Sequence, residues 1–167
     1  MKYSGILLDL DNTLYDYEAA HRPALAAALA QAGALSRADP VRTSEAFNAA
    51  RTHVHQRLEG TAASHNRLLY FQRMFELLDI NPLGHALDIY NCYWNIFLEH
   101  VAFEEGTEAF LGALAGVPVC LVSDLTAHIQ YRKIGKLGLA RLVRHVVTSE
   151  EAGREKPHPD IFRLALG

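Results

Sequence analysis

Residues 6–16 read ILLDLDNTLYD, and this stretch decides the fold. Three apolar residues are followed abruptly by two carboxylates, Asp9 and Asp11. A short apolar run without polar alternation is typical of a strand that is buried on both faces, as in a parallel sheet. Two carboxylates at the end of such a strand approach one site when the chain turns sharply there. The stretch therefore predicts a parallel α/β core with a carboxylate pair at the edge of its sheet.

Two further apolar runs, at residues 117–122 and 143–147, predict two more buried strands. The first run stops at Ser123 and Asp124, and a polar loop follows the second. In open parallel sheets, ligands bind outside the carboxyl ends of the strands. We therefore expect the residues that follow the three strands to share one site.

The long segment between the first two strands has helical spacing. Residues 18–32 are rich in Ala and Leu, with Gly33 as the expected stop, and apolar stripes predict further helices around residues 47–58, 68–78 and 90–101. Later helices are expected at residues 107–114 and 127–136 and from Pro159 onward. This order predicts a Rossmann-like parallel sheet, complete only to its third strand, with an all-helical insertion. We assign residues 1–16 and 101–167 to the core and residues 17–100 to a helical cap.

The overall composition excludes several classes of protein. The chain has 167 residues, half of them hydrophobic, and a net charge of −3, so it has no basic excess for nucleic-acid binding. Its apolar stretches are far shorter than a membrane span, and the N-terminus does not resemble a signal peptide, so we expect a cytoplasmic protein. The two cysteines are predicted to be reduced core residues, and the nine histidines lack zinc-site spacing.

Asp9 and Asp11 are the strongest candidates for chemistry. Hard cations such as Mg²⁺ prefer oxygen ligands, so a carboxylate pair suits that ion. One carboxylate can attack phosphorus and form an aspartyl-phosphate, while the other protonates the leaving oxygen and then activates water. The alternative is an Asx-rich turn that caps a helix.

Two later residues add to this pair. Ser123, at a strand-to-helix turn, can hold a phosphate with its hydroxyl and backbone N–H, or it can simply cap a helix. Lys156 precedes Pro157, and a residue before proline is pushed towards an extended conformation. Its ammonium can offset the charge of two carboxylates and a phosphate. The alternative is a solvated loop lysine.

Taken together, these motifs resemble those of the haloacid dehalogenase superfamily. Its first motif, Asp-x-Asp-x-Thr, is matched by Asp9, Asp11 and Thr13, its second by Ser123, and its third by Lys156. The resemblance covers nearly the whole chain. It implies a hydrolase of phosphoric monoesters with a helical cap inserted after the first motif.

The resemblance also implies a role for each matched residue. Asp9 would be the nucleophile and Asp11 the general acid/base, while Thr13, Ser123 and Lys156 would hold the phosphoryl group. The Asp9 carboxylate and the Asp11 backbone carbonyl would ligate Mg²⁺. Two cap residues, Tyr17 and His21, are candidate substrate contacts. The substrate would be a small phosphorylated metabolite such as a nucleotide, flavin mononucleotide or a sugar phosphate, and a phosphomutase remains an alternative.

The family pattern includes a fourth, acidic motif about twenty residues beyond Lys156, following a strand that lies beside the first one. The sequence ends at Gly167. From this we expect either a fragment of a longer protein or a chain whose first strand pairs with a partner, as in a homodimer or a strand swap. A non-catalytic binding module is the alternative function.

Overall fold

Three parallel strands form the sheet of this protein. The computed structural model describes residues 4–167, and its strands are β1 (Ile6–Leu8), β2 (Val119–Ser123) and β3 (His145–Thr148), in the order β1-β2-β3. Leu7 lies beside Cys120, which lies beside His145. Every residue of β2 is buried, as expected for the middle strand. The predicted fold class, a Rossmann-like parallel sheet with a helical insertion, is confirmed.

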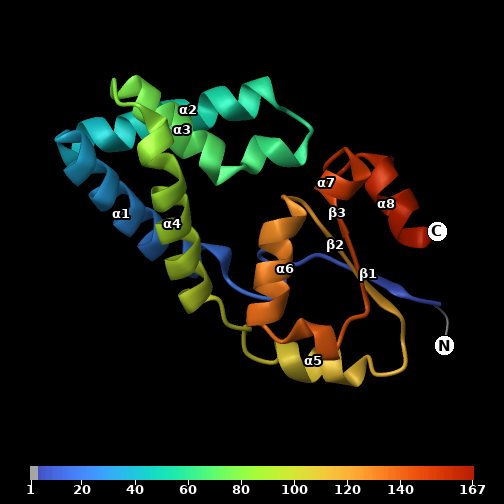
Figure 1. The fold of residues 1–167 in the computed structure, drawn as a ribbon. Coiled ribbons are helices and arrows are strands. Elements are labelled where there is room, and N and C mark those ends of the chain that lie inside the picture. The colour runs from blue at the N-terminus through green and yellow to red at the C-terminus, as the bar shows by residue number, and fades with distance from the viewer. Residues whose placement is uncertain (1–3) are drawn as a thin grey trace. The chain divides into compact units, whose positions relative to one another are not determined.

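Helices connect and cover these strands. They are α5 (Thr107–Ala113), α6 (Ala127–Lys136), α7 (Ser149–Ala152) and α8 (Pro159–Leu166). Figure 1 shows α6 and α8 on opposite sides of the sheet. On the α8 side, Ile161 packs with Cys120, Val122 and Val147. The side chains of alternate strand residues therefore have helices to pack against on both faces.

The chain divides into two compact units. One comprises residues 1–17, 60–63 and 101–167, which include the sheet, and the other comprises residues 18–59 and 64–100. The second unit consists mainly of α1 (Tyr17–Ser36), α2 (Pro40–Arg57), α3 (Arg67–Leu77) and α4 (Ala86–His100). Short 3₁₀ helices lie at Ala62–His65 and Pro82–Gly84. Its buried interior is rich in aromatic side chains: Phe47, Tyr70, Phe71, Phe75, Tyr93, Trp94 and Phe97.

The predicted stop of the first helix at Gly33 is wrong, because α1 continues to Ser36. Ala20, Ala24, Ala28 and Ala32 recur every fourth residue and are all fully buried, so one packed face runs along the helix. A Cβ atom at Gly33 would lie 3.3 Å from the Thr43 hydroxyl oxygen. The glycine therefore allows a close approach to α2 and does not end α1.

Strand boundaries also differ from the predictions by one or two residues. β2 begins at Val119, and the Pro118 carbonyl just before it already accepts a 2.8 Å hydrogen bond from the Ile6 backbone N–H. β3 begins at His145, because Val143 donates its N–H to Leu139 and belongs to the turn after the 3₁₀ helix Leu139–Arg141. The four-residue helix α7 was not predicted, since one turn is too short to give a periodic pattern.

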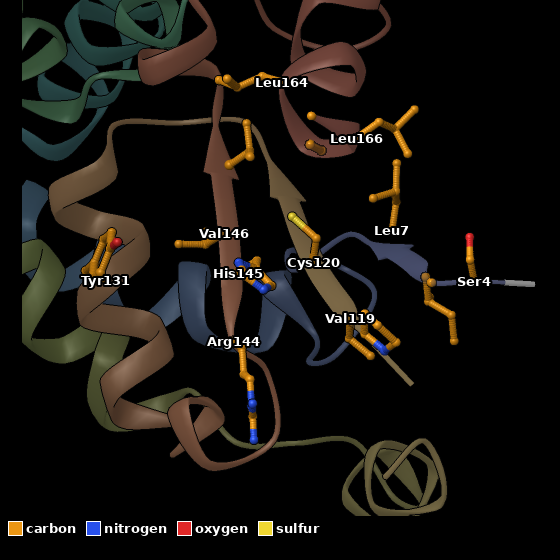
Figure 2. Close-up of a pocket in the computed structure, with 16 residues that line it drawn as sticks. Ser4, Leu7, Val119, Cys120, Tyr131, Arg144, His145, Val146, Leu164 and Leu166 are labelled. Atoms are coloured by element: carbon orange, nitrogen blue, oxygen red, sulfur yellow. The ribbon is translucent and has the colours of Figure 1, made fainter. Parts of the chain in front are cut away.

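β1 lies at the edge of the sheet among residues 4–167, and no second strand pairs with it there. A groove of about 600 Å³ adjoins this edge and is lined by residues of all three strands and of α8. Figure 2 shows Leu7, Cys120 and Leu166 around it. Leu7 is 37% exposed and Leu166 is 76% exposed. The predicted partner strand stays a prediction.

Across the described chain, no helix is both long and apolar enough to cross a membrane. Cys92 and Cys120 are both free cysteines.

Candidate active site

A tight turn after β1 sets the positions of Asp9 and Asp11. Between them, Leu10 is fully buried and anchors the chain, and its carbonyl accepts hydrogen bonds from Thr13 at 3.4 Å and Leu14 at 3.1 Å. Asn12 has a φ of 56°, in the left-handed region that asparagine adopts more readily than most residues. The turn explains how two carboxylates separated by one apolar residue remain at the same end of the strand.

Lys156 pairs directly with Asp9. Its Nζ lies 2.6 Å from Asp9 Oδ1 and 3.0 Å from the Val122 carbonyl oxygen, although the two charged residues are 147 positions apart in the sequence. The Lys156 backbone N–H donates to Asp124 Oδ1 at 2.9 Å, which holds the loop against the end of β2. The Asp9 side chain is still 41% exposed. A paired but accessible carboxylate suits a nucleophile that must meet an anionic substrate.

Asp11 is held from several sides. Lys133 Nζ lies 2.7 Å from its Oδ1, Gln130 Nε2 lies 3.1 Å from its Oδ2, and the Tyr15 hydroxyl donates to Oδ1. Burial alone would raise the pKa of Asp11, but the Lys133 ammonium and the hydrogen bonds from Lys133, Tyr15 and Gln130 bring that pKa below its ordinary value. The charged form of this carboxyl group is therefore the one that the site stabilises.

Ser123 lies within the same network. It is buried, and its Oγ lies 2.6 Å from Gln130 Nε2, which is also 2.7 Å from the Asp124 carbonyl oxygen. Beside it, the pKa of the Asp124 carboxyl group is raised, chiefly by burial and against the opposing effect of Lys156. The end of β2 thus joins the Asp9 and Asp11 sides of the site through Lys156 and Gln130.

The structure does not bring every predicted residue into this network. Thr13 is exposed in the turn after β1, and within residues 4–167 its side chain makes no hydrogen bond to Asp9 or Lys156. Tyr17 begins α1, and its backbone N–H donates to Asn12 Oδ1 at 3.0 Å. Their proposed roles, in phosphate and substrate binding, stay predictions.

His21 belongs to the helical unit, where its Nδ1 lies 2.7 Å from the Tyr93 hydroxyl oxygen. Burial, reinforced by the nearby Arg67 charge, lowers the pKa of His21 from 6.5 to about 4. The ring is therefore neutral at pH 7. Its predicted role as a substrate contact stays untested, since its observed partner is another residue of the same unit.

A sequence model of the haloacid dehalogenase-like hydrolases matches residues 3–167 of the chain. The chain belongs to this family. The predicted superfamily and the predicted class of enzyme, a hydrolase, are thereby confirmed.

Similar proteins agree with the family assignment. The chain is 40% identical over 167 residues to a ribulose-1,5-bisphosphate 5-phosphatase of Halopiger xanaduensis, and the match covers 98% of this chain and 70% of that protein. This relative supports the prediction that the hydrolase acts on phosphoric monoesters.

Solved structures with 18–19% sequence identity support the fold alone. A phosphatase of the family from Thermococcus onnurineus is 18% identical with a TM-score of 0.71, over 97% of this chain and 69% of that one. YfnB from Bacillus subtilis, a hydrolase of the family solved with bound magnesium, is 19% identical with a TM-score of 0.68, over 99% of this chain and 73% of that one.

Magnesium is the ion that the family implies. The site offers oxygen atoms, which are the type of ligand that Mg²⁺ prefers. The Asp9 carboxylate is accessible, while the Asp11 carboxylate is already engaged by Lys133, Gln130 and Tyr15, which leaves the backbone carbonyl of Asp11 as its predicted ligand. In the described part of the chain, no three His, Cys, Asp or Glu residues gather as metal ligands. Since Mg²⁺ in proteins usually keeps several waters and needs only one or two carboxylates, these residues can hold it.

Reasoning from sequence missed Lys133 and Gln130. Both lie on the buried face of α6, together with Ile129. The available signal was weak: polar residues at positions 130 and 133 share a helical stripe with Ile129 and Leu137. A lysine on an amphipathic helix is normally taken as exposed, and only the fold reveals its partner 122 residues away.

Proposed function

We propose that this hydrolase is a Mg²⁺-dependent phosphatase that removes a phosphoryl group from a small phosphorylated sugar through an aspartyl-phosphate at Asp9. The contact between Asp9 and Lys156, at 2.6 Å, carries the proposal, because it places an accessible carboxylate beside a cation. That pairing suits attack on an anionic phosphate, and Asp11 follows on the same turn as a second carboxyl group.

In the first step, a carboxylate oxygen of Asp9 attacks phosphorus and forms a new P–O bond. The bond from phosphorus to the ester oxygen breaks, and that oxygen takes a proton from the Asp11 carboxyl group to leave as an alcohol. This step needs the protonated form of a carboxyl group that Lys133 and its other hydrogen-bond donors keep charged in the free protein, and the negative charge of a bound phosphate favours that protonated form. Lys156 offsets the negative charge on the transferring group, and Ser123 is the expected hydrogen-bond donor to it.

In the second step, the Asp11 carboxylate takes a proton from a water molecule whose oxygen attacks phosphorus. The bond between phosphorus and Asp9 breaks, so inorganic phosphate leaves and the Asp9 carboxylate is restored. The contacts that Asp11 makes with Lys133 and Gln130 favour the charged form that this step requires. The Asp9 carboxylate and the Asp11 backbone carbonyl would hold Mg²⁺, which would offset the repulsion between the carboxylate and the phosphate.

The proposed substrate class rests on the relative from Halopiger. That protein is named for the 5-phosphate of a sugar bisphosphate, and it is 40% identical to this chain over 98% of this chain and 70% of its own length. Among nucleotides, flavin mononucleotide and sugar phosphates, we therefore favour the sugar phosphates, with ribulose-1,5-bisphosphate as the first compound to test.

The test is phosphate release from ribulose-1,5-bisphosphate, ribose 5-phosphate, nucleoside monophosphates and flavin mononucleotide, each with Mg²⁺ and with a chelator. We expect Mg²⁺-dependent turnover that is fastest on a sugar phosphate and absent in Asp9→Asn. Activity that survives the chelator or Asp9→Asn would contradict the mechanism. Binding of these esters without any turnover would favour the non-catalytic alternative.

A further inference from the structure

Lys133 is a fully buried lysine in the middle of α6. Its side chain has 0% exposure, and its Nζ lies 2.7 Å from Asp11 Oδ1. A buried ammonium without a partner is very costly, and a buried ion pair is often no more stabilising than well-packed apolar side chains in its place. Packing alone therefore gives little reason for a lysine at this position.

The contacts of Asp11 show what the lysine does. Lys133 and the Tyr15 hydroxyl both bond Oδ1, while Gln130 Nε2 bonds Oδ2 at 3.1 Å. Both carboxylate oxygens are thus bonded, from two different elements of the chain. A carboxylate held in this way cannot turn about its χ angles without breaking hydrogen bonds.

Gln130 extends this hold to the neighbouring strand. Its Nε2 also lies 2.6 Å from Ser123 Oγ and 2.7 Å from the Asp124 carbonyl oxygen. Its own Oε1 is buried and has no hydrogen-bond partner among the residues that the structure describes. An unpaired buried acceptor costs free energy. The hydrogen bonds that Nε2 donates to Asp11 and Ser123 therefore set the orientation of this amide.

We propose that Lys133 and Gln130 are positioning residues, which lock the Asp11 carboxyl group in the orientation for proton transfer to and from the phosphoester. This inference rests on the proposed function. Neither residue is expected to touch the substrate, and both act through Asp11. Proton transfer by a well-placed group contributes about 10²–10⁴-fold to rate, and a displacement of about 1 Å can remove most of it.

The leaving group provides the test, because p-nitrophenolate departs without a proton whereas a sugar alkoxide needs one. We expect Lys133→Met to lower kcat/KM about 100-fold for the sugar phosphate that the wild type hydrolyses fastest. For p-nitrophenyl phosphate the loss should stay within about tenfold. Lys136→Met, at an exposed lysine on the same helix, is the matched control and should change neither value.

A merely structural role for Lys133 would lower kcat/KM equally for both esters, and that result would overturn the proposal. A second comparison does not depend on the stability of one variant. If Lys133 acts through Asp11, the double variant Asp11→Asn, Lys133→Met should be no slower than Asp11→Asn alone, whereas additive losses would contradict the inference. A wild type that hydrolyses neither ester would overturn the proposed function and this inference together.

Discussion

At the scale of single residues, the site consists of charged side chains that the fold brings together from distant parts of the chain. Asp9 and Asp11 were identified from the sequence, because a carboxylate pair directly after an apolar run is a local pattern. Lys156 was identified with help from the family resemblance. Lys133 was not, because the helical stripe that it shares with apolar residues is too weak a signal to distinguish a buried lysine from an exposed one. Its role depends on a contact across 122 positions.

Lys156 is expected to be essential for rate. Replacing it with Met removes the cation that lies 2.6 Å from Asp9 and leaves the transferring phosphoryl group without its positive partner. Loss of one such group typically lowers kcat by about 10²–10³-fold, and we expect a loss in this range with folding intact. Steady-state kinetics would measure kcat, and circular dichroism would check the folding. A loss of kcat below about tenfold would show that Lys156 only holds its loop against the end of β2.

His21 predicts a pH dependence of stability in the helical unit. The pKa of His21 is about 4 in the folded protein, whereas its ordinary value, which we take for the unfolded chain, is 6.5. Between pH 4 and pH 6.5 the unfolded chain therefore binds more protons at His21 than the folded protein does. Stability should therefore fall as the pH is lowered from 6.5 towards 4 and should not change through this residue above pH 6.5. Urea unfolding across this range would measure the slope.

The matched variants for this effect are His21→Gln and His100→Gln. His100 is exposed in the same unit, so its replacement should leave the slope unchanged, whereas His21→Gln should flatten it. Identical slopes in the wild type and His21→Gln would show that His21 is not responsible.

At the scale of elements, the sequence located nearly every helix and strand but not all of their ends. The apolar runs of the strands and the spacing of the helical stripes are properties of neighbouring residues, so they can be read locally. At Gly33 in α1, a Cβ atom would lie 3.3 Å from the hydroxyl oxygen of Thr43 in α2, so the close packing of two helices favours glycine there. Such tertiary contacts override the local preference of glycine for a helix end.

The turn after β1 can be tested through Asn12. This residue has a φ of 56°, and its Oδ1 accepts the backbone N–H of Tyr17 at 3.0 Å. Asn12→Ala should lower the free energy of unfolding by about 1–2 kcal/mol, since alanine disfavours the left-handed region and cannot accept the hydrogen bond. Asn12→Asp should retain most of the stability, and Asn12→Gly should lie between the two.

Chemical denaturation would rank these three variants. An alanine variant as stable as the aspartate variant would mean that neither the backbone conformation nor the hydrogen bond of Asn12 supports the turn.

At the scale of the whole molecule, β1 is an edge strand of the sheet that residues 4–167 form. Leu7, which is 37% exposed, lies on this edge beside a groove that Leu164 and Leu166 also line. An unpaired strand edge with apolar neighbours favours pairing with another strand. The predicted partner for this edge, a second copy of the chain or a swapped strand, stays a prediction.

Sedimentation velocity over a range of concentrations tests this pairing. We expect a dimer for the wild type and a shift towards monomer for Leu7→Lys, which places a charge at the edge. The exposed residue Leu83, in the helical unit, offers the control Leu83→Lys, which should leave the dimer intact. A wild type that stays monomeric at every concentration would contradict the prediction.

We propose that Asp9 becomes covalently phosphorylated during turnover. The most direct measurement is mass spectrometry of the acid-quenched enzyme after it is mixed with Mg²⁺ and a sugar phosphate. We expect one added phosphoryl group on the peptide that contains Asp9. It should be absent in Asp9→Asn. Turnover without any phosphorylated peptide, or with the label on another residue, would contradict the account.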